Sequence, residues 1–174
     1  FGGSCLPKDV RALTHEGRLG GEELPLLESL LPSNEAHLAK LIELAKRLAK
    51  DRVTLLGLSF KSDTDDLRES PMVEVAQHLL GRGFELSIYD PQLNLAKLIG
   101  TNKRVIDEKM PHLASLLTGD LATALGQSGL VIAAQKCIDL ETLRPLITAE
   151  HTLLDVNGWP ELRDLPAHYE GFCW

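Results

Sequence analysis

Residues 53–58 have the sequence VTLLGL, a short run in which only Thr54 has a polar side chain. A strand that is buried on both faces of a parallel sheet is apolar at nearly every position, so this run predicts such a strand. A polar loop follows over residues 59–69. Ser70 and Pro71 then predict the start of a helix, with a capping side chain and a proline in the first turn.

The alternation of short apolar strands and helices continues to the end of the sequence. A second strand is expected over residues 84–89, which alternate in polarity and stop at Asp90. Further strands are expected at 130–134 and 152–156, and helices near 93–99, 120–127 and 140–147. This order predicts a parallel sheet with right-handed crossovers. We therefore predict that residues 51–174 form a doubly wound, Rossmann-like α/β domain.

The first 50 residues have a helical pattern instead. Pro7 suits the first turn of a helix that runs to about Gly17, and residues 26–50 place apolar side chains at helical spacing. Pro32 either kinks this second helix or divides it in two. We favour one kinked helix, because the apolar faces on the two sides of Pro32 are nearly in phase. We expect residues 1–25 to end a preceding helical domain and residues 26–50 to connect it to the α/β domain.

Composition and charge argue against several classes of protein. The 174 residues are 44% hydrophobic and 25% charged, which is typical of a globular protein. With 18 basic and 25 acidic residues the net charge is −7, which disfavours a nucleic-acid-binding surface. The sequence contains no apolar run of about 18–20 residues, the length that spans a bilayer. It also contains no secretory signal peptide, so we expect a cytoplasmic protein that does not enter a membrane.

The cysteines and histidines do not suggest a disulfide framework or a metal site. The three cysteines Cys5, Cys137 and Cys173 are widely spaced, and we expect reduced thiols. The six histidines form no HxH or HExxH pair, so we expect no bound metal. The sequence begins at Phe1 inside a glycine turn, which suggests a piece of a longer protein.

The first segment with candidate chemistry is FGGSCLPKD, residues 1–9. Cys5 directly precedes the predicted helix, and Lys8 lies about one turn further on. The N–H groups at a helix start and a nearby cation both stabilise a thiolate. A lone cysteine is more often an inert, buried residue, and we keep that interpretation for Cys137 and Cys173. For Cys5 we favour a reactive thiol.

The second such segment is GLSFKSDTDDLRES, residues 57–70, directly after the first strand. Open parallel sheets bind ligands beyond the carboxyl ends of their strands. Lys61 and Arg68, together with the start of the next helix, suit a phosphate or pyrophosphate. The alternative is a solvated, charged loop. No G-x-G-x-x-G follows the strand, so we expect Asp90 to form a turn rather than to bind a ribose.

Taken together, FGGSCLPKD and GLSFKSDTDDLRESP resemble the nucleotide-sugar 6-dehydrogenases of the UDP-glucose/GDP-mannose dehydrogenase family. The resemblance spans essentially the whole chain. The segments GLSFK and TDDLRESP and the tail GFCW are most similar to members that oxidise GDP-mannose to GDP-mannuronate for alginate synthesis. Members that oxidise UDP-glucose or a UDP-N-acetylhexosamine are the nearest alternative. An alternative of another class is a non-catalytic module for nucleotide binding or dimerisation.

The resemblance implies an NAD-dependent, four-electron oxidation of an alcohol to a carboxylate through a cysteine thioester. It also implies a homodimer or larger assembly around the 26–50 helix, and an NAD-binding domain upstream of Phe1, without which the chain is expected to be inactive. The matched positions are Cys5 and Asp9 for catalysis, Gly2 and Lys61 for the sugar nucleotide, and Lys8 and Arg68 for NAD.

Overall fold

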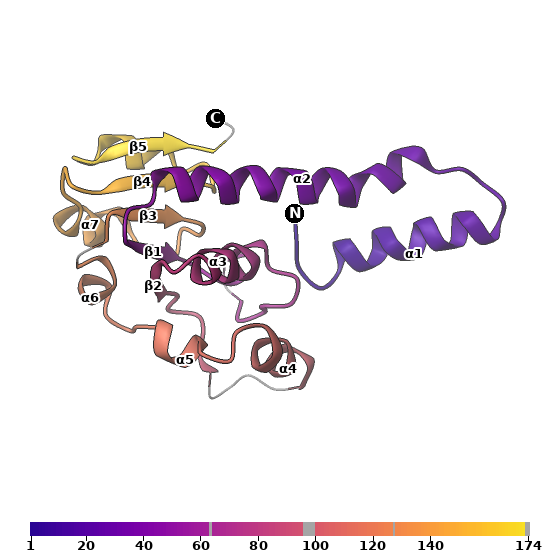
Figure 1. The fold of residues 1–174 in the computed structure, drawn as a ribbon, viewed down its shortest axis with the longest axis horizontal. Coiled ribbons are helices and arrows are strands. Elements are labelled where there is room, and N and C mark those ends of the chain that lie inside the picture. The colour runs from indigo at the N-terminus through magenta and orange to yellow at the C-terminus, as the bar shows by residue number, and fades with distance from the viewer. Residues whose placement is uncertain (63, 96–99, 127, 173–174) are drawn as a thin grey trace.

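The computed structural model describes residues 1–62, 64–95, 100–126 and 128–172. Its centre is a five-stranded sheet in the order β2-β1-β3-β4-β5 (Figure 1). All neighbouring strands are parallel. The predicted doubly wound α/β fold is therefore confirmed. The strands are β1 (Arg52–Leu56), β2 (Glu85–Tyr89), β3 (Leu130–Ala133), β4 (Thr152–Asp155) and β5 (His168–Gly171).

Alternate residues of the central strands enter two apolar cores, one on each face of the sheet. In β3, Leu130 and Ile132 belong to the first core, whereas Val131 and Ala133 belong to the second. Every residue of β1 after Arg52 is buried, as the VTLLGL run predicts. Burial on both faces explains why the strand sequences are almost continuously apolar.

The helices divide between these two cores. Those that border the first core are α2 (Pro25–Leu48), α3 (Pro71–Gly81), α4 (Gly100–Lys109) and α5 (Leu113–Leu116). Those that border the second are α6 (Leu121–Leu125), α7 (Leu140–Leu143) and the 3₁₀ helices η2 (Arg144–Leu146) and η3 (Pro160–Asp164). The helix predicted near 93–99 falls mostly outside the described residues. The sequence pattern does not predict α4, α5, η3 or β5.

The remaining helix, α1 (Leu6–Leu19), pairs with α2 in a hairpin that extends beyond the sheet (Figure 1). α2 continues through Pro32 as a single helix, so the expectation of one helix is confirmed. Its C-terminal half buries Leu41, Ile42 and Ala45 in the first core. In the described part of the chain, no helix combines the length and the apolar character that a bilayer span requires.

Candidate active site

The loop at the carboxyl end of β1, residues 57–70, is fixed at its base. One carboxylate oxygen of the buried Asp90 accepts hydrogen bonds from the backbone N–H of Leu58, at 2.9 Å, and of Ser59, at 3.2 Å. Its other oxygen accepts from Gln92 N. Ser70 caps α3 and donates to the Leu58 carbonyl at 2.7 Å. Asp90 therefore shapes the backbone, as predicted, with its carboxylate occupied by these donors.

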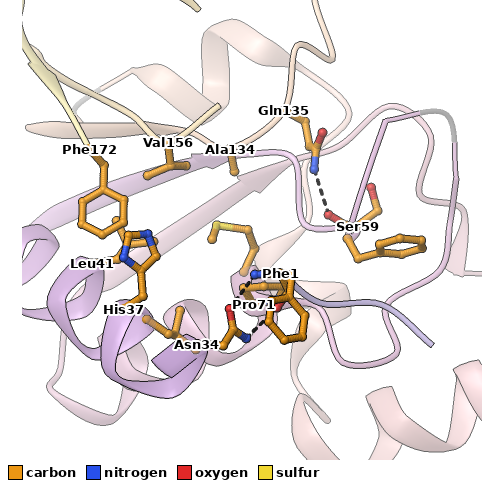
Figure 2. Close-up of a pocket in the computed structure, with 13 residues that line it drawn as sticks. Phe1, Asn34, His37, Leu41, Ser59, Pro71, Ala134, Gln135, Val156 and Phe172 are labelled. Carbon is orange, nitrogen blue, oxygen red and sulfur yellow. Dashed lines mark hydrogen bonds between the residues drawn. The ribbon is translucent and has the colours of Figure 1, made fainter. Parts of the chain in front are cut away.

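Gln135 holds the same loop from the neighbouring strand. The strand order reverses between β1 and β3, and Gln135 lies just beyond β3. Its Nε2 donates to the Ser59 carbonyl at 3.2 Å (Figure 2). Its Oε1 accepts from Ser62 Oγ at 3.0 Å. A Cβ on Gly57, which has a φ of +89°, would lie 2.4 Å from Gln135 Cβ. Gln135 thus fills the space beside the first turn, where a dinucleotide-binding fold places its glycine-rich turn.

The N-terminal turn lies directly on this loop. Gly3 N donates to the Glu69 carbonyl at 2.9 Å, and Arg11 forms an ion pair with the Glu69 carboxylate. A Cβ on Gly2 would lie 2.3 Å from the Glu69 carbonyl oxygen, and one on Gly3 would lie 2.6 Å from the Phe60 ring. Both glycines are required by this close approach. The two motifs, about sixty residues apart, are therefore in direct contact.

Cys5 is exposed at the start of α1. Its carbonyl accepts from Asp9 N at 2.9 Å, which places Asp9 one turn further along the helix. Lys8 and Asp9 form an ion pair of 3.2 Å with both side chains exposed. The structure thus places Cys5, Lys8 and Asp9 on one exposed helical turn at the start of α1.

Arg68 lies beside this turn and is held by Asp66. Its Nε and Nη2 each donate to the Asp66 carboxylate at 2.8 Å. This guanidinium lowers the pKa of Asp66, and the carboxylate raises the pKa of Arg68, to which the charge of Cys5 also contributes. Ser4 Oγ donates to Asp66 at 3.2 Å and lies 3.9 Å from the Cys5 sulfur. The sequence singled out Arg68 but gave no signal for Ser4 or Asp66.

Lys61 lies near the other end of the loop. Its side chain is exposed, and its Nζ lies 5.3 Å from the centroid of the Phe60 ring, the ring that contacts Gly3. Lys61 is therefore adjacent to Phe60, and Arg68 to Glu69, the two loop residues that contact Gly3.

Two cavities lie at the carboxyl edge of the sheet, and Ser59 and Gln135 line both. The first, about 220 Å³, lies between α2 and the strand ends (Figure 2). The rings of His37 and Phe172 meet there at 4.7 Å between centroids. The second, about 550 Å³, is lined by Tyr89, Lys136 and Cys137 among others.

Cys137 differs from Cys5 in its surroundings. Burial, with the Asp90 carboxylate nearby, raises the pKa of its thiol to about 12. The expectation of an inert thiol is thus supported at Cys137. Cys173 lies outside the described residues, so the same expectation for it stays a prediction.

Comparisons with known proteins identify the family. Residues 54–159 match the model of the UDP-glucose/GDP-mannose dehydrogenase family, UDP binding domain. The chain belongs to this family. The resemblance found in the two motifs is therefore confirmed.

Relatives of known name match over the whole chain. It is 41% identical to a GDP-mannose 6-dehydrogenase of Pseudomonas putida and 42% identical to that of Pseudomonas aeruginosa, and in both cases it covers 40% of the relative. The crystal structure of a ternary complex of GDP-mannose dehydrogenase from Pseudomonas aeruginosa aligns over 100% of this chain and 40% of its own, with a TM-score of 0.83 and 41% identity. A UDP-glucose dehydrogenase from Pyrobaculum islandicum aligns over 100% of this chain and 38% of its own, with a TM-score of 0.77 and 31% identity.

Proposed function

We propose that this chain is the carboxyl-terminal part of an NAD-dependent GDP-mannose 6-dehydrogenase and that Cys5 is its catalytic nucleophile. The observation that carries this proposal is the position of Cys5. Its thiol is exposed at a helix start, and the preceding residues Gly3 and Ser4 contact the loop that contains Lys61 and Arg68. The whole-length similarity to GDP-mannose 6-dehydrogenases supports the choice of substrate.

The chemistry that suits an exposed thiol here is addition to an aldehyde. After the alcohol has been oxidised to the aldehyde, the Cys5 sulfur bonds to the carbonyl carbon and the oxygen takes up a proton. Loss of a hydride and a proton leaves a thioester, which water hydrolyses to the carboxylate and the regenerated thiol. NAD, when bound, supplies the hydride acceptor for both oxidations. Asp9, one turn beyond Cys5, orients the water.

The cationic side chains divide between the two ligands. Lys61 binds the diphosphate of the sugar nucleotide, the Gly2 turn contacts the sugar nucleotide, and Lys8 contacts NAD. Arg68 suits an anionic cofactor because its pair with Asp66 uses the Nε and Nη2 side, while 41% of its side chain remains exposed. Since Gln135 fills the space beside Gly57, we assign the main NAD site to another domain of the full-length protein.

The assembly and its location are part of the same proposal. The enzyme works in the cytoplasm as a homodimer or larger assembly built around α2. The hairpin of α1 and α2 supports the assembly, because Leu19 and Leu26 at its end are 70% and 75% exposed.

The test is NADH formation by the natural-length protein with GDP-mannose, UDP-glucose and a UDP-N-acetylhexosamine. We expect the highest kcat/KM with GDP-mannose and the largest thermal shift on its binding. A higher kcat/KM with UDP-glucose would favour the alternative supported by the Pyrobaculum structure. No NADH with any substrate, together with equal reactivity of Cys5 and Cys137, would favour a non-catalytic module.

A further inference from the structure

Cys5 is connected through Ser4 to a carboxylate and a guanidinium of the 57–70 loop. The Ser4 hydroxyl lies 3.9 Å from the Cys5 sulfur and 3.2 Å from Oδ2 of Asp66. Asp66 holds Arg68 through two side-chain hydrogen bonds of 2.8 Å. The four residues Cys5, Ser4, Asp66 and Arg68 form a continuous series of contacts, which we call the Cys5 network.

The direction of each hydrogen bond in the Cys5 network follows from the number of hydrogens available. Because Arg68 lowers the pKa of Asp66, this carboxylate is ionised at neutral pH and can only accept. The Ser4 hydroxyl has a single hydrogen, which Asp66 receives. The Ser4 oxygen therefore offers only lone pairs to Cys5. It accepts from the thiol S–H and has no hydrogen left for a thiolate.

Asp66 itself is held firmly. Its Oδ1 accepts from the Nε and the backbone N of Arg68, and its Oδ2 accepts from Arg68 Nη2 and Ser4 Oγ. These four bonds match the roughly four lone-pair positions of a carboxylate. Only 14% of the Asp66 side chain is exposed. These hydrogen bonds therefore fix the positions of Ser4 and Arg68 relative to Asp66.

We propose that Asp66 is a positioning residue that acts on Cys5 through Ser4, holding the Ser4 hydroxyl so that its oxygen orients the thiol by accepting from the S–H when no ligand is bound. The meaning of this role for catalysis rests on the proposed function. Among the described residues, Arg68 also interacts with the charge of Cys5, and Asp66 already binds it. The Lys8–Asp9 pair follows in the first turn of α1, and its two charges oppose each other.

The test is the rate of Cys5 alkylation by iodoacetamide in the Asp66→Asn variant of the natural-length protein. The rate is measured from pH 6 to pH 10 on the Cys5 peptide by mass spectrometry. In asparagine, Oδ1 can keep accepting from Arg68 while Nδ2 donates to the Ser4 oxygen, so the Ser4 hydrogen becomes available to a thiolate and one negative charge is gone. We expect the midpoint of the rate–pH curve to fall by about half a pH unit. The alkylation rate at neutral pH should then rise about threefold. The plateau at high pH should stay unchanged, because Cys5 is already exposed.

Two further variants test whether Asp66 acts on Cys5 through Ser4 or only holds the N-terminal turn against the 57–70 loop. Glu69→Gln disturbs the ion pair with Arg11, which joins the same segments without touching Ser4, and it should leave the midpoint unchanged. In a Ser4→Ala background, Asp66→Asn should have less than half of its effect on the midpoint, because the connecting hydroxyl is missing.

Three results would overturn the proposal. One is a change in the plateau alone, which would indicate altered access to Cys5. Another is an equal midpoint shift in Glu69→Gln, and the third is a full Asp66→Asn shift without Ser4. Alkylation requires neither substrate nor NAD. If a Cys5→Ser variant retained full turnover, the proposed function would fail while the comparison of midpoints would still decide the role of Asp66.

Discussion

The regions around Cys5 and Cys137 place the same side chain in opposite environments. Cys5 lies exposed before the first turn of α1, near Arg68 and two hydrogen-bonding side chains. Cys137 follows β3, where burial and the nearby Asp90 raise the pKa of its thiol to about 12. The difference predicts that the reactivity of a thiol in this fold depends on burial and on neighbouring charges rather than on closeness to the sheet edge.

The largest expected effect comes from removing the two sulfurs one at a time. In the natural-length protein, Cys5→Ser should lower turnover by roughly three orders of magnitude or more, because a serine alkoxide forms far less readily than a thiolate. Binding of the sugar nucleotide should remain. Cys137→Ser is the matched control and should keep most of the activity. Steady-state NADH formation and a thermal shift measure both, and near-normal turnover of Cys5→Ser would remove the thiol from the mechanism.

The next effect is the difference in alkylation rate between these two cysteines. Raising the pKa of Cys137 from 9.0 to about 12 lowers its thiolate fraction at neutral pH by about a thousandfold. We expect limiting iodoacetamide at neutral pH to modify Cys5 at least a hundredfold faster than Cys137, as measured on separate peptides by mass spectrometry. Equal labelling in the folded protein would contradict the comparison, and equal labelling in 6 M guanidinium chloride serves as the control.

A third prediction asks whether the cations on the Cys5 side bind the ligands. Lys61→Ala should mainly raise the KM for the sugar nucleotide, and Arg68→Ala should mainly raise the KM for NAD. Loss of a charge-assisted hydrogen bond costs about 1.5–3 kcal/mol, which corresponds to roughly a tenfold to hundredfold change. Lys136→Ala, beside Cys137, is the control and should change neither constant. If Lys136→Ala raises either KM as much, the ligands contact the Cys137 side as well.

The sequence predicts the centre of the fold well because burial leaves a periodic signal. β1 and β3 are apolar on both faces, and Ser70 and Pro71 mark the start of α3 in a purely local way. β5 escapes prediction because it is a four-residue edge strand that buries no residue fully. The sequence pattern does not predict α4 because most of its side chains are polar and its apolar stripe is weak.

The candidate site also combines residues that the local sequence indicates with residues that it does not. Cys5 and Arg68 stand out by residue type and by position beside a helix or strand end. Ser4 and Asp66 are 62 residues apart, and Gln135 contacts Ser59 across 76 positions. No periodicity connects such pairs. Their roles become visible only when the fold brings a hydroxyl, a carboxylate and an amide to the same loop.

The smallest expected effect concerns acid stability, which should separate Asp66 on the Cys5 side from Asp139 on the Cys137 side. Arg68 lowers the pKa of Asp66, so the pair stabilises the fold above the ordinary Asp pKa of about 3.9 and loses this contribution as the pH falls through the lowered value. Because Arg68 is 41% exposed, solvent screening limits this contribution to about 0.5–1 kcal/mol. Asp66→Asn should therefore lower the free energy of unfolding in urea at pH 6, and by a smaller amount at pH 3. Asp139 caps α7 by accepting from Thr142, and these hydrogen bonds also lower the pKa of Asp139. Because asparagine caps a helix about as well, Asp139→Asn should cost less than Asp66→Asn at pH 6. If Asp66→Asn costs as much at pH 3 as at pH 6, the carboxylate stabilises the loop through its shape rather than its charge.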